Sequence, residues 1–186
     1  MSKSTPTQQL RIIGGQWRSR RLRFPSIDGL RPTMDRVRET VFNWLQFDVE
    51  NARVLDAFAG SGALGFEALS RGAKEVIFLE KNAKAALQLK DNLQTLEAKN
   101  AQVWAGDALA WLDQNPEPYD LVFLDPPFNK DLLQPAIEKL RLLPGALVYI
   151  EHEAKLKPDF PENWNERKSK NTKEFCFRLF EVTEQS

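Results

Sequence analysis

The sequence predicts an α/β fold in which a mostly parallel sheet carries helices on both faces. From Arg53 to about residue 150, short apolar runs alternate with helical stretches, as expected for parallel strands joined by crossover helices. A glycine-rich turn follows the first apolar run, where such folds bind ligands. Segment 164–182 instead contains two alternating runs around a short polar turn, which predicts an antiparallel hairpin that completes a seven-stranded sheet.

Composition limits the classes of protein to consider. The chain has 186 residues, of which 42% are hydrophobic and 28% charged, as in a soluble domain with one core. No apolar run approaches the ~20 residues of a membrane-spanning helix, and the polar start lacks the apolar segment of a secretory signal, so we expect a cytoplasmic protein. The single cysteine, Cys176, excludes an internal disulfide, and with one histidine, His152, we expect no metal site. We expect a monomer because no extra apolar surface is evident.

The chain divides into three parts. Residues 1–10 are polar and are predicted to be disordered. Residues 11–50 should form a basic appendage, in which Gly14-Gly15 supplies the two-residue turn of a β-hairpin with Arg11–Ile13 and Gln16–Arg18 as its arms. A helix of about Met34–Phe47 follows, with apolar residues at helical spacing and Thr33 as a possible cap.

Residues 51–186 should form the main domain. The expected strands are Val54–Ala59, Glu75–Leu79, Ala101–Ala105, Tyr119–Leu124, Ala146–Ile150, Trp164–Lys170 and Glu174–Val182. The expected helices are Ala63–Arg71, Ala83–Glu97, Ala108–Asn115 and Leu132–Leu143.

A net charge of zero conceals a strong asymmetry. Residues 1–38 contain nine Lys and Arg against two Asp and Glu, so this segment is near +7 and the remainder near −7. Guanidinium groups suit phosphate oxygens and stack on bases, so arginines interspersed with aromatic residues indicate RNA contact, with a merely solvated basic face as the alternative. The candidate RNA-binding residues are Arg11, Arg18, Arg20, Arg21, Arg31, Arg36 and Arg38.

The glycine-rich turn is the candidate cofactor site. Gly60 and Gly62 stand where the first strand turns into a helix, and their small size lets a ligand approach the backbone and the helix N-terminus. With Gly65 they also match a dinucleotide fingerprint. Asp56 precedes this turn, and its carboxylate would repel a pyrophosphate but suits the ammonium group of S-adenosylmethionine. We expect Phe58 to lie beside the same ligand.

Two further acids follow the second and third strands. Glu80 ends the second apolar run, where its carboxylate could accept hydrogen bonds from both ribose hydroxyls of the ligand. Asp107 follows the third strand and could bind the adenine amino group, or it could cap the next helix.

The segment Asp125-Pro126-Pro127-Phe128 directly follows the fourth apolar run and is the candidate catalytic loop. The amino nitrogen of a nucleobase is a poor nucleophile because its lone pair is delocalised into the ring. If the Asp125 carboxylate and the Pro126 carbonyl accept its two N–H groups, the nitrogen can pyramidalise and direct the lone pair at a methyl carbon. Phe128 would stack on a base taken out of its helix, and this chemistry needs no metal.

Four other reactive residues are assigned structural roles. Glu151, His152 and Glu153 follow the fifth strand and are interpreted as solvated or loop-stabilising. Cys176 is interpreted as a small residue of the sheet, because no partner base is placed for it.

The residues leave several functions open. A methyltransferase acting on a guanine N2 or an adenine N6 amino group fits the Asp125 loop equally well. A nicotinamide-dependent oxidoreductase fits the glycine fingerprint, and a non-catalytic RNA-binding assembly factor needs only the arginines.

The sequence resembles the bacterial RsmD-type 16S rRNA (guanine-N2)-methyltransferases from Arg11 to Glu181. Four pieces carry the resemblance: Arg11–Gly15, Leu30–Leu45, Asp56–Gly65 and Asp125–Phe128. The first two are the most specific to that family, whereas the last two recur across amino-methylating enzymes. Ser19 departs from the family pattern, in which we expect glycine.

That resemblance implies a class I (Rossmann-like) S-adenosylmethionine-dependent methyltransferase that modifies one guanine of the assembled small ribosomal subunit. Carried over by position, it places Asp125 and Phe128 in the catalytic loop, and Asp56, Gly60, Gly62 and Glu80 in the donor site. Arg31, Thr33 and Arg36 fall in a segment that should cover the donor or meet RNA.

Overall fold

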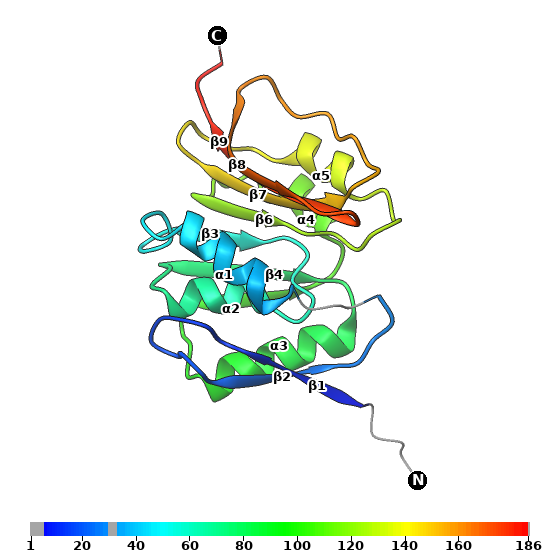
Figure 1. Cartoon of the computed structure of the whole chain (residues 1–186). Helices are drawn as coiled ribbons and strands as arrows, with labels where there is room; N and C mark the ends of the chain where they lie inside the picture. Colours follow the sequence, from blue (N-terminus) through cyan, green and yellow to red (C-terminus); the bar gives the residue numbers. More distant parts are fainter. Residues whose placement is uncertain (1–5, 30–32, 186) are drawn as a thin grey trace.

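The computed structural model describes residues 6–29 and 33–185, which form a two-stranded ribbon, a seven-stranded sheet and five helices (Figure 1). The strand order of the sheet is β5-β4-β3-β6-β7-β9-β8. The first five strands are parallel, and β9 is antiparallel to both β7 and β8. This confirms the predicted α/β fold and its closing hairpin. No helix within the described ranges is long and apolar enough to cross a membrane.

The elements of the main domain lie close to the predicted segments. The strands of the sheet are β3 (Arg53–Asp56), β4 (Glu75–Glu80), β5 (Ala101–Ala105), β6 (Leu121–Leu124), β7 (Leu147–Glu153), β8 (Trp164–Asn171) and β9 (Phe175–Val182). The helices are α1 (Asp35–Trp44), α2 (Ala63–Ser70), α3 (Ala83–Thr95), α4 (Ala108–Gln114) and α5 (Leu133–Lys139). One difference matters for function, because β7 continues to Glu153 instead of ending at Ile150.

Alternating side chains of the sheet divide the interior into two hydrophobic clusters. Leu121 and Phe123 of β6 pack with α1, α2 and α3 on one face, whereas Val122 and Leu124 pack with α4 and α5 on the other. This alternation follows from the two-residue period of a strand, and a strand buried on both faces is apolar throughout. Residues of both N-terminal strands, such as Leu10 and Phe24, belong to the first cluster.

The N-terminal antiparallel hairpin is present as predicted, but its strands and its turn differ from the prediction. Its strands are β1 (Thr7–Arg11) and β2 (Arg21–Pro25), which pair antiparallel, so the predicted arms at 11–13 and 16–18 and the disorder of residues 7–10 are wrong. Residues 1–5 lie outside the described residues. β2 runs along α3, where the Asn92 side chain donates to the Arg23 carbonyl at 2.8 Å (Figure 1).

Gly15 serves close packing and not a two-residue hairpin turn. It adopts a φ of +75°, and a Cβ there would lie 1.9 Å from the carbonyl oxygen of Ser70 at the end of α2. The next amide, of Gln16, donates to that carbonyl at 2.8 Å. The connecting loop closes through Ser19, whose φ of +70° explains why the family resemblance leads us to expect glycine at this position.

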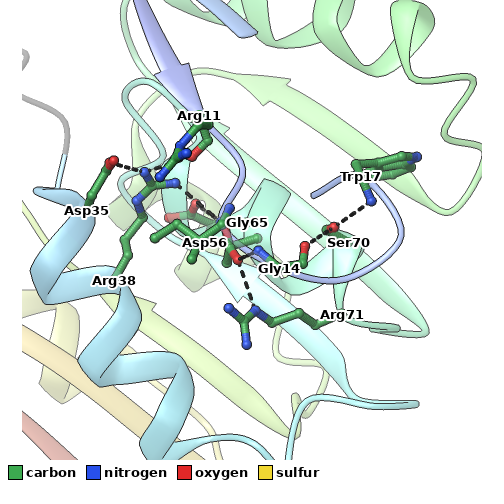
Figure 2. Close-up of polar contacts among 11 residues, drawn as sticks. Arg11, Gly14, Trp17, Asp35, Arg38, Asp56, Gly65, Ser70 and Arg71 are labelled. Carbon is green, nitrogen blue, oxygen red and sulfur yellow. Dashed lines mark hydrogen bonds and ion pairs between the residues drawn. The ribbon is translucent and has the colours of Figure 1, made fainter. Parts of the chain in front are cut away.

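A buried carboxylate fastens this loop to the domain. Glu67 of α2 is 0% exposed, and its side chain accepts the amides of Ile13 and Gly14 at 3.0 and 2.9 Å. The same carboxylate accepts the Arg71 Nε–H at 2.9 Å and lies 3.6 Å from Nη1 of Arg38. Figure 2 shows this cluster, in which Gly14, Arg38 and Arg71 converge. The loop is therefore held rigidly against the domain.

Candidate active site

A cleft of about 1010 Å³ opens at the carboxyl ends of the parallel strands. Loops after β3, β4, β5 and β6, and the end of β7, line it, as expected for the ligand crevice of such a sheet. The predicted site residues that line this cleft are Asp56, Phe58, Gly60, Glu80, Asp107, Asp125, Pro126 and Phe128. The fold thus brings the donor-site candidates and the catalytic-loop candidates into one cavity.

Asp56 is buried and hydrogen-bonds to the glycine-rich segment. Its side chain is 2% exposed, and Oδ2 accepts the Gly65 amide at 3.0 Å. Burial raises the pKa of Asp56 to about 7, the Gly65 hydrogen bond lowers it, and the Glu80 carboxylate raises it further. A cationic ligand would reverse this shift, because a nearby positive charge favours the ionised carboxyl.

Gly62 has a conformational role in the turn. It begins α2 with a φ of +81°, and a Cβ there would lie 2.5 Å from the Phe66 ring. It is not among the residues that line the cleft, so its donor contact stays a prediction, and the role that the structure gives it is one of backbone geometry.

Glu80 ties two loops together at the end of β4. One carboxylate oxygen accepts the Gly60 amide at 2.7 Å and the other accepts the Asn82 amide at 2.8 Å. An ionised carboxylate has about four acceptor positions, so both oxygens can accept further hydrogen bonds from a ligand.

Asp107 caps helix α4, which was one of its two predicted roles. Its Oδ1 accepts the Ala110 amide at 3.0 Å at the start of α4. The residue also lines the cleft, so the cap does not remove it from the ligand site.

Asp125 leaves β6 as the first residue of the catalytic loop. Thr33 donates its hydroxyl to Oδ2 of Asp125 at 3.2 Å, whereas the N-cap of α1 is Met34. The predicted cap at Thr33 is therefore wrong, and this residue instead connects the N-terminal part to the catalytic loop. Arg31 lies outside the described residues.

The rest of the catalytic loop is fixed by packing and by a hydrogen bond to β7. Phe128 is half-buried and packs against the first hydrophobic cluster, and Pro126 is buried. Asn129 follows with a φ of +59°, and its amide donates to the Glu153 carboxylate at 2.6 Å. The extension of β7 to Glu153 therefore positions the loop.

The predicted solvation of Glu151 and His152 is wrong. Both belong to β7 and are 7% and 2% exposed. Glu151 lines the cleft, and Oε2 accepts the Tyr149 hydroxyl at 3.2 Å. Burial lowers the pKa of His152, whose Nδ1 lies 2.8 Å from the Glu153 carbonyl oxygen. Sequence reasoning missed Glu151 because the apolar run ends one residue before it.

Arg38 is not available to RNA phosphates. It is 1% exposed, bonds to the Arg11 carbonyl at 2.9 Å and to Asp35 at 2.5 Å, and also faces Glu67 (Figure 2). Its predicted RNA contact is therefore wrong, because the apolar face of α1 carries its side chain into the core. The remaining described arginine candidates are exposed, namely Arg11, Arg18, Arg20, Arg21 and Arg36.

A second, smaller groove adjoins the cleft. It has a volume of about 460 Å³ and lies between α1 and the β8–β9 turn. Arg36, Lys170 and Lys173 line it, and all three are exposed. Met34, Val37, Glu174 and Phe175 line both the groove and the cleft, so the two cavities are adjacent.

The geometry agrees with comparisons to known proteins. A family profile described as "Conserved hypothetical protein 95" matches residues 10–181, and it corresponds to the RsmD family. The chain belongs to the RsmD-type methyltransferase family.

Ribosomal RNA small subunit methyltransferase D of Escherichia coli (strain K12) is 46% identical over 178 residues, covering 93% of this chain and 90% of that protein. The Haemophilus influenzae protein of the same name is 48% identical over 181 residues, covering 93% and 94%. A solved Escherichia coli structure described as a methyltransferase has a TM-score of 0.87 at 44% identity, over 96% of this chain and 100% of that one.

Membership of the RsmD-type family settles the class of the protein. It is an enzyme of the transferase class with the fold of class I methyltransferases. This excludes the nicotinamide-dependent oxidoreductase and the non-catalytic assembly factor, both of which the residues alone had left open.

Proposed function

We propose that this enzyme transfers a methyl group from S-adenosylmethionine to the N2 amino group of one guanine in 16S rRNA, within the assembled small ribosomal subunit. The observation that carries the proposal is the convergence of the glycine-rich turn and the Asp125 loop on one cleft. The names of the relatives, which specify small-subunit rRNA, support the choice of substrate. The reaction would take place in the cytoplasm, where subunits are assembled.

The donor site suits S-adenosylmethionine. The buried Asp56 carboxylate would pair with the ammonium group, and the remaining acceptor positions of Glu80 would receive the ribose hydroxyls. Asp107 would receive the adenine amino group, with Phe58 beside the ligand. When bound, S-adenosylmethionine supplies an electrophilic methyl group, whose bond to sulfur breaks as the N2 electron pair forms the new N–C bond.

The catalytic loop would prepare the acceptor. The Asp125 carboxylate and the Pro126 carbonyl accept the two N2–H groups, which localises the lone pair on nitrogen. Asp125 then takes the proton that N2 releases after methylation. Phe128 stacks on the flipped base, a contact worth ~1–3 kcal/mol.

Exposed basic residues would hold the rRNA. The exposed arginines of the ribbon and its loop would contact phosphates on one side. Arg36, Lys170 and Lys173 line the groove that adjoins the cleft, where the strand next to the flipped base would run. The sequence did not suggest these two lysines, because the C-terminal segment has no cluster of arginines.

The test is the transfer of a labelled methyl group to unmodified small subunits and to naked 16S rRNA, followed by nucleoside analysis. We expect N2-methylguanosine from subunits, and Asp125→Ala should abolish its formation while donor affinity is retained. N6-methyladenosine as the product would instead support the adenine-N6 alternative. Full turnover by the Asp125 variant would refute the role of this carboxylate.

A further inference from the structure

Asp125, directly after β6, and Glu151, in the neighbouring strand β7, both line the cleft. In the parallel register of β6 and β7, Phe123 pairs with Tyr149 and Leu124 with Ile150, so Asp125 follows beside Glu151. The strands are about 4.8 Å apart. Phe123 and Tyr149 both face the first hydrophobic cluster, and the two-residue period directs Asp125 and Glu151 to that same side.

Tyr149 places the Glu151 carboxylate at the cleft. Its hydroxyl donates to Oε2 of Glu151 at 3.2 Å, and both side chains are buried. Burial first, and then the charges of Glu151 and Asp125, raise the pKa of Tyr149 well above its ordinary value, so the hydroxyl stays a neutral donor. Glu151 also lines the cleft together with Asp125.

We propose that Glu151 accepts the N1–H of the target guanine and thereby selects guanine over adenine. The inference rests on the proposed function, because it assumes that the amino group held by Asp125 is N2 of guanine. On the Watson–Crick edge of guanine, N1–H lies next to the N2 amino group. Two adjacent carboxylates can therefore accept hydrogen bonds from these adjacent N–H groups. Adenine presents its amino group beside N1, which is an acceptor.

The selectivity follows from the opposition of two acceptors. With adenine in the cleft, the Glu151 carboxylate would face the N1 lone pair, and no hydrogen bond could form between them. Sites built to hydrogen-bond a substrate N–H discriminate against analogues that lack it by up to about 10⁴–10⁵-fold. A single N–H contact to a charged acceptor gives less than this limit, and we expect about 100-fold.

The experiment uses subunits reconstituted with 2,6-diaminopurine at the nucleotide that the parent enzyme methylates. This base keeps the N2 amino group but lacks N1–H. The parent should methylate it about 100-fold less efficiently than guanine, measured as kcat/KM. In Glu151→Gln the side-chain amide can donate to N1, so guanine methylation should fall and the preference for guanine should shrink at least tenfold.

Two controls separate recognition from stability. Glu151→Gln should keep the parent's donor affinity and thermal midpoint, and Glu162→Gln, at an exposed site outside the cleft, should keep the full preference for guanine. Tyr149→Phe removes the hydroxyl that orients Glu151 and should weaken the preference partially.

An unchanged preference in Glu151→Gln, at whatever overall rate, would overturn the inference while leaving the proposed function intact. Absence of N2-methylguanosine from the parent reaction would instead overturn the proposed function.

Discussion

Replacing Glu67 with Gln should test whether the buried carboxylate anchors the N-terminal loop. The carboxylate accepts the Ile13 and Gly14 amides and the Arg71 guanidinium, and it lies 3.6 Å from Arg38. In the Gln variant an NH₂ group must face at least one of these donors. The variant therefore loses hydrogen bonds to a charged group. Among the described residues, it leaves the guanidinium of Arg38, 1% exposed, with Asp35 as its charged partner.

The size of the effect follows from these contacts. Losing one hydrogen bond to a charged group costs ~1.5–3 kcal/mol, and breaking a buried ion pair by removing one partner costs ~3–5 kcal/mol. We expect the free energy of unfolding to fall by about 4 kcal/mol. With an m value of about 2 kcal/mol per molar urea, the unfolding midpoint should fall by about 2 M.

Urea unfolding followed by circular dichroism measures this change. Glu39→Gln, at an exposed position of α1, is the matched control and should change stability by less than about 0.5 kcal/mol. Adding Arg38→Met to Glu67→Gln should recover part of the loss, because it removes the uncompensated buried charge. A loss below about 1 kcal/mol in Glu67→Gln would refute this account of the anchor.

Two further predictions concern the donor site and the RNA groove. Because the pKa of Asp56 is about 7 in the folded protein and 3.8 in the reference state, the folded chain holds a proton that the unfolded chain releases. The free energy of unfolding of the ligand-free parent should therefore fall, relative to Asp56→Asn, as pH rises from about 4 to about 7, and parallel curves from urea titrations would contradict this. Replacing Lys170 and Lys173 with Gln should reduce the slope of log affinity for subunits against log salt by about 1.4, if each lysine neutralises one phosphate of a single strand. Donor affinity should stay at the parent value, the same change at the exposed Lys74 and Lys99 is the control, and equal salt slopes for parent and groove variant would count against the groove.

Local patterns were sufficient to predict the sheet and most of the cleft. Apolar runs such as Leu121–Leu124 are buried on both faces, so their composition identified them as parallel strands. Because the carboxyl ends of parallel strands meet at one edge, the acids and glycines that follow them could be assigned to one site, and all of these except Gly62 and Gly65 line the cleft.

The sequence by itself thus determined the order along the chain of the strands and helices of the main domain, the edge of the sheet that binds ligands and the loop that carries Asp125. Only the tertiary structure decided that Arg38 is buried, that Gly15 packs against α2 and that Glu151 faces the cleft. The physical reason is the separation along the chain of the residues that decide each feature. A strand period or a glycine turn is set by neighbours along the chain, whereas the burial of a charged side chain depends on the partners that other elements bring to it, and Glu67 is 29 residues from Arg38 in sequence.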